Sequence, residues 1–248
     1  MALTDNLISY WELEETSGSR ADAHTGGNTL SDNNTVTSNP GKVATAAQFT
    51  VANSEYLSRA DNASLSMGDI DFTIAAWVYF DTVANQREIV GKGFSPHEYR
   101  LLYAGPGTGL NHFAFAVSND GSSGFAGEID ATTFGAASAS TWYFVVAWHD
   151  SVANTVNIQI NNGTVDSVSY SLGVFDGTAD FNIGGYGGFE TWDGRIDQVG
   201  LWKRVLSSTE RTSLWNGGSG MSYAALSGGG AADLSVVAQE PWVGGSTF

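Results

Sequence analysis

The chain has 248 residues, of which 31 are glycine and none is cysteine, and its formal net charge is −16. The lack of cysteine excludes disulfide bonds and thiol chemistry. The negative charge argues against nucleic acid as a partner, because phosphate groups need a basic surface, and no apolar run approaches the roughly 18 residues of a membrane span, so we expect no membrane insertion.

Short β-branched and aromatic segments alternate with polar turns along the first half of the chain. Residues 6–13 have the alternation of a first strand, and the polar residues 16–39 predict a long loop. Two short strands are expected at residues 43–49 and 55–58. The strongest strand pattern lies at residues 72–80, where neither face is polar, so we expect this strand to be covered on both sides.

Further strands are expected in the second half of the chain, at residues 88–92, 99–104, 112–118, 142–148, 156–160 and 165–170. The dipeptide Asn162-Gly163 is typical of a tight hairpin turn. The closing strand, residues 196–202, is followed by Ser207 and Glu210, which are spaced as a capping box for a short helix that ends by Gly217. This succession predicts an all-β fold, an antiparallel jelly-roll sandwich with one short C-terminal helix and an extended tail.

The composition changes after residue 218. Residues 1–218 are expected to form the jelly-roll domain, and residues 219–248 a tail that begins with a Gly- and Ser-rich linker. We expect the apolar side chains of the tail to dock on a second copy of the chain or on a scaffold protein. The alternative is that the tail folds back on its own sandwich. The predicted docking residues are Leu234, Val236, Val237, Trp242 and Val243.

Several segments occur in a recognisable order: LISYWELEETSG, the loop from Asp22 to Asn28, GKVATAAQF, DFTIAAWVYF, TWYFVVAWHD with VNIQINNG, and GRIDQVGLWKRVLSSTE. In this order and spacing they resemble the strands, central hairpin and closing helix of the concanavalin A-like, laminin-G-like jelly-roll family. The resemblance covers residues 6–218 and departs from the family at Val51, where glycine is usual. It implies a fold shared by lectins, adhesion modules, hydrolases and virion proteins, so function must be argued from sites.

Asp22 and Asp197 are the candidate metal ligands. The resemblance implies that a calcium ion sits where a loop near the first strand meets the last strand, and these two positions match that pattern. Ca²⁺ takes roughly six to eight oxygen ligands and can clip distant segments together, so its expected role is structural. The alternatives are an Asx turn at Asp22 and a carboxylate bonded to backbone at Asp197.

Aromatic residues in two glycine-containing regions are candidates for sugar binding. Sugars present apolar C–H faces that pack on aromatic rings, and hydroxyl groups that donate to Asn and Asp side chains. The alternative is that these rings pack the rim of the sandwich. The predicted ligand-binding residues are Tyr99, Arg100, Asn119, Asp120, Tyr186, Phe189 and Trp192.

The segment Glu128-Ile129-Asp130 resembles half of a glycosidase motif. Laminarinase-type glycosidases on the same sandwich carry a Glu-x-Asp-x-(x)-Glu strand, and retaining hydrolysis needs two carboxyl groups about 5 Å apart. Thr132 and Thr133 stand where the second glutamate should be. We therefore expect no catalytic residues and no enzymatic activity.

These features favour a non-enzymatic structural or adhesion protein of a virus particle, a phage decoration or tail-associated protein that can bind surface glycans. Its expected partners are copies of itself or a capsid or tail scaffold protein. The first residues lack the basic and apolar regions of a signal peptide, so we expect assembly in a host cytoplasm and a place on the virion surface. The alternative is a free-standing bacterial carbohydrate-binding lectin, secreted or on the cell surface by a route without a signal peptide.

Overall fold

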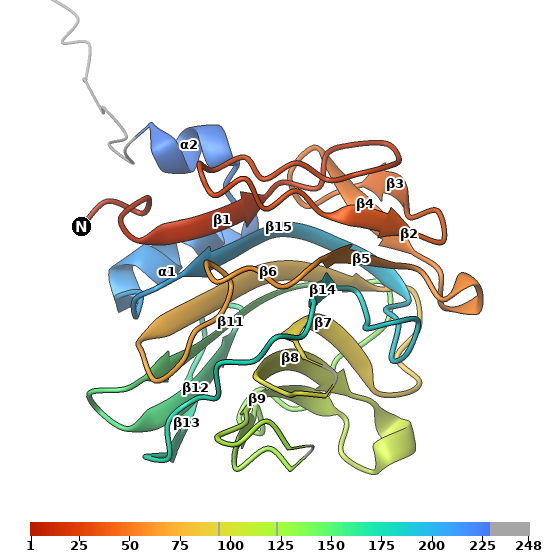
Figure 1. Cartoon of the computed structure of the whole chain (residues 1–248). Coiled ribbons are helices and arrows are strands. Elements are labelled where there is room, and N and C mark those ends of the chain that lie inside the picture. Colours follow the sequence, from red (N-terminus) through yellow and green to blue (C-terminus); the bar gives the residue numbers. More distant parts are fainter. Residues whose placement is uncertain (94, 123, 229–248) are drawn as a thin grey trace, which may run out of the picture.

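The computed structural model of the chain describes residues 1–93, 95–122 and 124–228, which form two antiparallel β-sheets packed face to face (Figure 1). The predicted all-β sandwich and the short helix near the C-terminus are confirmed. Within these ranges no helix combines the length and the apolar character needed to cross a membrane. The five predicted docking residues, Leu234, Val236, Val237, Trp242 and Val243, lie outside the described residues.

The larger sheet holds eight of the described strands. Its closing strand β15 (Gly194–Trp202) pairs with β6, β4 and β1, which all come from the first third of the chain. The other strands of this sheet are β1 (Leu7–Trp11), β3 (Thr37–Pro40), β4 (Thr45–Phe49), β6 (Phe72–Phe80), β11 (Trp142–Asp150), β12 (Thr155–Ile160) and β13 (Val165–Ser169).

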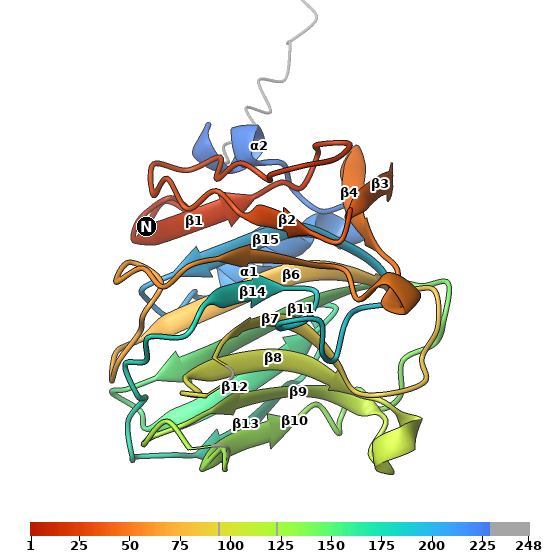
Figure 2. The same cartoon turned by 45° about the vertical axis from the view of Figure 1, so that its right-hand side comes forward.

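The second sheet holds seven of the described strands in the order β10-β9-β8-β7-β14-β5-β2. This sheet forms the front of the molecule in the view of Figure 2. Its strands are β2 (Ser31–Asn33), β5 (Tyr56–Arg59), β7 (Arg87–Lys92), β8 (Tyr99–Ala104), β9 (His112–Val117), β10 (Gly127–Asp130) and β14 (Phe181–Ile183).

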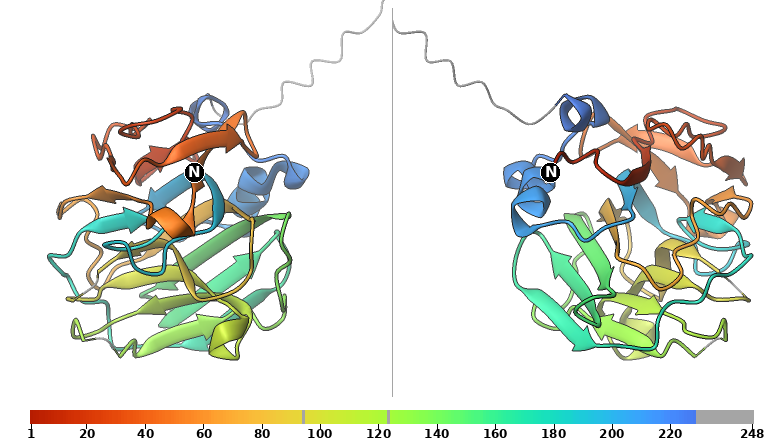
Figure 3. Two further views of the ribbon diagram at one scale, coloured as in Figure 1. Left: turned by 90° about the vertical axis from the view of Figure 1, so that its right-hand side faces the viewer. Right: turned by 60° about the vertical axis from the view of Figure 1, so that its left-hand side comes forward.

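The inner faces of the two sheets enclose the main core, and a second apolar cluster lies on the outer face of the eight-stranded sheet. In β6, Phe72 and Ile74 belong to the main core while Ala75 and Trp77 belong to the outer cluster. The expectation that this strand is covered on both sides is therefore confirmed. Helix α1 (Ser208–Trp215) lies against this outer face, as the left view of Figure 3 shows.

The capping box predicted for α1 is present. The Ser207 side chain accepts from the Glu210 backbone N–H, and the Glu210 carboxylate accepts from the Ser207 backbone N–H at 2.8 Å. The helix ends at Trp215, because Asn216 takes a left-handed φ of 47° before Gly217 is reached. Single 3₁₀ turns lie at η1 (Val51–Asn53), η2 (Pro106–Thr108) and η3 (Asn216–Gly218).

Packing against the sandwich is also seen among the described residues 219–228, which follow the predicted domain limit of 218. A second helix, α2 (Tyr223–Ser227), lies in the segment that composition suggested as a linker. Leu226 is buried in the outer cluster, and the Tyr223 backbone N–H donates to Glu12 Oε1 at 2.9 Å. A few apolar contacts therefore order a stretch whose glycine and serine content indicated freedom.

Candidate ligand-binding site

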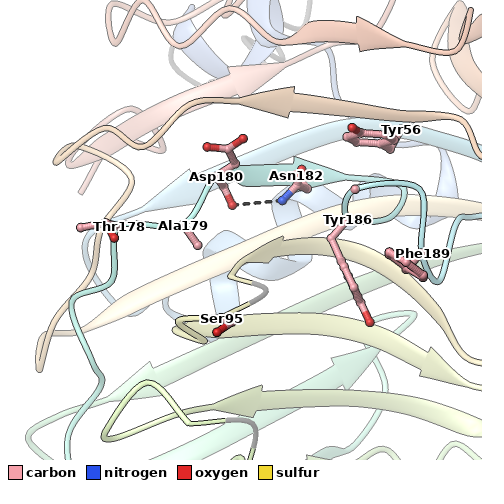
Figure 4. A pocket seen from close by; sticks show the side chains of 9 residues that line it. Tyr56, Ser95, Thr178, Ala179, Asp180, Asn182, Tyr186 and Phe189 are labelled. Atoms are coloured by element: carbon pink, nitrogen blue, oxygen red, sulfur yellow. Dashed lines mark hydrogen bonds between the residues drawn. The ribbon is translucent and has the colours of Figure 1, made fainter.

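A pocket of about 280 Å³ opens on the outer face of the seven-stranded sheet. Within the part of the chain that the structure describes, the helices lie on the other sheet, so the strands here face outward without a helical cover (Figure 2). The pocket is lined by Tyr56, Ser95, Thr178, Ala179, Asp180, Asn182, Tyr186, Gly187 and Phe189 (Figure 4).

Strand alternation places two of the lining side chains. On β14, Phe181 and Ile183 are fully buried in the core, so Asn182 between them points to the outer face. On β5, Leu57 is buried in the core, so its neighbour Tyr56 points outward in the same way. The Asn182 side-chain amide donates to the backbone carbonyl of Asp180 at 3.0 Å, which fixes its orientation at the polar end of the pocket (Figure 4).

Tyr186 and Phe189 form the aromatic end of the pocket. The backbone N–H of each donates to the carbonyl of the other, at 3.1 and 2.7 Å, so residues 186–189 close a tight turn, called here the aromatic hairpin. Gly187 and Gly188 between them have φ of 53° and 84°, the pair of positive values that a type I′ turn needs. The turn brings the two ring centroids to 6.1 Å, and 62% of Phe189 remains exposed.

An ionic cluster behind the aromatic hairpin holds it against the sheet. Arg100 on β8 forms ion pairs with Glu190, which follows the hairpin, and with Glu88 on β7, where Nε lies 3.5 Å from Oε2. Gln86 Nε2 donates to Glu190 Oε1 at 2.7 Å, and the Glu88 backbone N–H donates to the Glu190 carbonyl at 2.9 Å. The hairpin is thus anchored to two strands through one residue.

Burial sets the protonation of this cluster. Loss of solvent raises the pKa of Glu88 to about 8, although the Arg100 guanidinium opposes the rise. Burial disfavours the charge of Arg100, but Glu88 and Glu190 together raise its pKa above the ordinary value. Burial and the neighbouring Glu190, which hydrogen-bonds with the Tyr186 side chain, raise the pKa of Tyr186 to about 12, so the Tyr186 hydroxyl is neutral at pH 7.

The structure divides the predicted ligand-binding residues into two groups. Tyr186 and Phe189 line the pocket, and their role in binding stays a prediction. Tyr99 and Trp192 were candidates for sugar binding, but both are fully buried in the core and neither lines the pocket, which agrees better with the alternative that these rings pack the sandwich. The Tyr99 hydroxyl donates to the Leu65 carbonyl at 2.8 Å.

Three other predicted residues lie away from the pocket lining. Arg100 is nearly buried and serves the ionic cluster instead. Asn119 and Asp120 lie in the exposed turn after β9, where Asp120 Oδ1 accepts the Ser122 backbone N–H at 2.9 Å. Neither of these two side chains lines the pocket.

Sequence reasoning missed Tyr56, Ser95, Thr178, Asp180 and Asn182. A signal existed for Asn182, which lies between the apolar strand residues Phe181 and Ile183, and a weaker one for Tyr56, which stands beside Leu57. The other three come from loops whose place over the sheet depends on the whole fold.

The acidic pair on β10 lies on another part of the molecule's surface. Glu128 is exposed, and Asp130 Oδ1 lies 2.8 Å from His112 Nε2 on the neighbouring strand β9. Partial loss of solvent around the Glu128 carboxylate, followed by the nearby charge of Asp130, raises its pKa. The absence of catalysis, expected from Thr132 and Thr133, stays a prediction.

The carboxylates of Asp22 and Asp197 serve separate segments. Asp22 accepts backbone N–H groups of Tyr10, His24 and Asn28, each at 3.0 Å, so both of its oxygens are engaged in shaping the loop that it begins. Asp197 Oδ2 accepts the backbone N–H of Lys42 at 2.7 Å and that of Val43 at 2.9 Å. The two alternatives considered for these residues, turn formation and backbone bonding, describe these contacts.

The oxygens that remain available at Asp22 and Asp197 limit where a calcium ion could bind. Among the described residues there is no group of three or more acidic or histidine side chains able to hold a metal. Asp197 Oδ1 is buried without a hydrogen-bond partner in the described part of the chain, and burial raises the pKa of Asp197 to about 8. Calcium binding stays a prediction, and Oδ1 of Asp197 is the oxygen available for it.

Comparison with known proteins agrees with this architecture. Residues 51–210 match the model of a family described as the concanavalin A-like lectin/glucanases superfamily. No curated protein sequence matches the chain.

Similar solved structures come from toxins and from a polysaccharide-degrading enzyme. The binding domain of Paraclostridial mosquitocidal protein 1 has a TM-score of 0.67 and 14% identity, covering 87% of this chain and 53% of that chain. The binding domain of botulinum neurotoxin DC in complex with SialylT has a TM-score of 0.58 and 12% identity, and the match covers 87% of this chain and 52% of that chain. This chain therefore spans about half the length of those two domains.

Domain 4 of AbnA, an extracellular arabinanase from Geobacillus stearothermophilus, matches over nearly its whole length. Its structure, in complex with arabinotriose, has a TM-score of 0.59 and 18% identity, and the match covers 84% of this chain and 97% of that chain. At these identities the likeness is one of fold.

Proposed function

Because the chain belongs to the concanavalin A-like lectin/glucanases superfamily, we propose that it is a carbohydrate-binding domain and that the pocket on the outer face of the seven-stranded sheet is its binding site. The observation that carries this proposal is the exposed ring of Phe189, held beside Tyr186 by the two-glycine turn. A preformed aromatic surface next to hydrogen-bond acceptors is what sugar recognition requires.

The two ends of the pocket suit the two kinds of surface that a sugar presents. The C–H face of a sugar ring packs on Phe189 and Tyr186, and its hydroxyl groups donate to the Asp180 carboxylate and the Asn182 side-chain oxygen. A volume of about 280 Å³ lies just below the range of roughly 300–1,000 Å³ typical of ligand pockets. We therefore propose that it binds a short segment or the end of a glycan. The arabinotriose held by the AbnA domain supports this choice of ligand class.

Substitution of Phe189 tests the proposal. Phe189→Ala should weaken glycan binding about fivefold or more, because stacking of one aromatic ring contributes about 1 kcal/mol or more, while the melting temperature should hardly change for a side chain that is 62% exposed. Leu172→Ala removes another exposed apolar side chain, 63% exposed and absent from the pocket lining, as a matched control. Binding is measured on a glycan array and by calorimetry with the best ligand. Equal binding by both variants would exclude this pocket.

We also propose, as the sequence predicts, that the domain acts without catalysis and serves adhesion on a virus particle, with a free-standing bacterial lectin as the alternative. Detection of the chain by mass spectrometry in purified particles supports the first role. Its detection only in culture medium or on bacterial cells supports the second. Hydrolysis of a β-glucan that is lost in Glu128→Gln would contradict both.

A further inference from the structure

We propose that the pocket selects neutral glycans and disfavours glycans that carry a carboxylate, such as sialic or uronic acids. The inference rests on the proposed function, because it names the class of sugar that the same pocket accepts. It is carried by the charges of the side chains that line the pocket and of those directly behind it.

No cationic side chain lines the pocket in the described part of the chain. Its ionisable lining groups are the carboxylate of Asp180, which is exposed, and the phenols of Tyr56 and Tyr186. Proteins usually recognise a carboxylate with the fork of an arginine or with the charge of a lysine. Here a sugar carboxylate would meet a carboxylate.

Arg100, the cation behind the aromatic hairpin, is already committed. It forms ion pairs with both Glu88 and Glu190, and its side chain is only 11% exposed. With Glu88 ionised the three groups carry a net charge of −1, and with Glu88 protonated the net charge is zero. The cluster therefore never presents a net positive charge to the pocket.

The two cations nearest to Asn182 along the sheet point to the other side. Arg59 and Lys92 are both paired with Phe181, whose side chain lies in the core, whereas Asn182 faces outward. Lys92 is fully buried, with Nζ 2.9 Å from Asp61 Oδ1 and 3.0 Å from Glu98 Oε2. Neither cation shares the face on which the pocket opens.

His97 adds no positive charge either. It follows the lining residue Ser95 by two positions and is almost completely buried. Burial, and then the nearby charge of Arg100, lower the pKa of His97 below its ordinary value, so the ring is neutral at pH 7.

An acidic sugar therefore loses hydrated charge on entry and gains repulsion from Asp180, within a chain whose formal net charge is −16. A neutral sugar keeps the same ring contacts and hydroxyl donors without that cost. Selectivity of this kind comes from a repulsive element as well as from attractive contacts. It should weaken as salt rises, because a Debye length of about 10 Å at 0.1 M screens exposed charges.

The experiment uses the full chain on an array of matched glycan pairs, in which the two members differ only by a terminal sialic acid or by a uronic acid in place of the neutral sugar. We expect the acidic member of each pair to bind at least about tenfold more weakly at low salt, with the difference shrinking at high salt. Equal or tighter binding of acidic members overturns the inference and leaves the proposed function standing. Binding of no glycan overturns both.

Substitution of Asp180 separates charge from shape. Asp180→Asn keeps an oxygen acceptor and removes the charge, so acidic glycans should bind several-fold better while neutral ones change little. Asp5→Asn removes the same charge at an exposed position beside Arg204, outside the pocket lining, and should leave the ratio of neutral to acidic binding unchanged. An unaltered ratio in Asp180→Asn would show that the charge of Asp180 does not set the selectivity.

Discussion

Arg100 on β8 and Glu190 after the aromatic hairpin form an ion pair that joins the seven-stranded sheet to the ring-bearing turn. Arg100 also forms an ion pair with Glu88 on β7, so one guanidinium holds two carboxylates from different segments. The geometry of the pocket therefore depends on residues that do not line it.

Removal of Arg100 should loosen the hairpin and lower stability. Arg100→Met leaves Glu88 and Glu190 without their cation, and we expect a loss of roughly 3 kcal/mol in the free energy of unfolding, at the low end for a broken buried pair because Glu88 can take up a proton. Arg100→Lys keeps the charge but loses the planar fork, so it should recover part of the stability. Urea unfolding measures both, and hydrogen exchange at residues 186–190 reports the hairpin. Unchanged exchange in Arg100→Met would contradict an anchoring role.

The two-glycine turn should tolerate asparagine but not a β-branched residue. Gly187 has a φ of 53°, and a Cβ added there meets no heavy atom within 4 Å, so any cost comes from the backbone alone. Gly187→Val should cost roughly 1–2 kcal/mol and reduce glycan binding. Gly187→Asn, which adopts this conformation more readily, should stay close to the wild type. Equal effects of the two substitutions would argue against a required left-handed conformation.

Stability should fall as pH rises from about 4.5 to about 8. Burial raises the pKa of Glu88 and of Asp197 to about 8 in the folded protein, so between the unfolded and folded pKa values the folded state holds protons that the unfolded chain has released. The stabilisation is complete below the unfolded pKa and is lost as pH rises through about 8. Asp197→Asn keeps an acceptor for Lys42 and Val43 and should flatten this dependence.

Urea unfolding at several pH values measures the effect of Asp197→Asn. The exposed carboxylate Asp5 supplies the control, since Asp5→Asn removes one charge without a buried group. A pH dependence that is as steep in Asp197→Asn as in the wild type would show that Asp197 is ionised in the folded protein throughout this range.

Asp22 should stabilise the fold independently of calcium. Its three backbone hydrogen bonds shape residues 22–28, so Asp22→Ala should lower the free energy of unfolding by about 1–3 kcal/mol with or without chelator. Any stabilisation by added Ca²⁺ should depend on Asp197, whose Oδ1 has no hydrogen-bond partner in the described residues. Elemental analysis and melting curves with calcium or chelator test this. A calcium response that disappears in Asp22→Ala and persists in Asp197→Asn would reverse the assignment.

Helix α2 should belong to the domain rather than to the tail. A chain ending at residue 228 should melt like the full chain, whereas one ending at residue 218 loses Leu226, whose burial contributes about 1.5–3 kcal/mol. Calorimetry compares the two.

The oligomeric state of the chain ending at residue 228 also tests the predicted docking of Leu234 and Trp242, because a dimer or particle attachment that survives this truncation would exclude it.

The sequence predicted best those elements that depend on residues close together in the chain. The alternation in β6 and the capping box at Ser207 involve residues close in sequence, and both are present. The hairpin turn predicted at Asn162-Gly163 lies one residue earlier: Asn161 and Asn162 have positive φ, and the Gly163 backbone N–H donates to the Ile160 carbonyl at 2.9 Å. The same alternation in β8 could have revealed that Tyr99 points inward with Leu101, since both occupy one face of a strand. Trp192 carried no such signal, because it lies just before a strand in a loop rich in glycine.

The sequence by itself determined the fold class, the family resemblance and the capped helix α1, because alternation and capping act over a few residues. Only the tertiary structure decided which aromatic side chains stay exposed and which segments meet at the pocket. The lining comes from β5, the segment after β7, and the chain around β14, which are brought together by strand pairing far apart in sequence. Burial, and with it the raised pKa of Glu88, depends on this long-range packing, which no local pattern encodes.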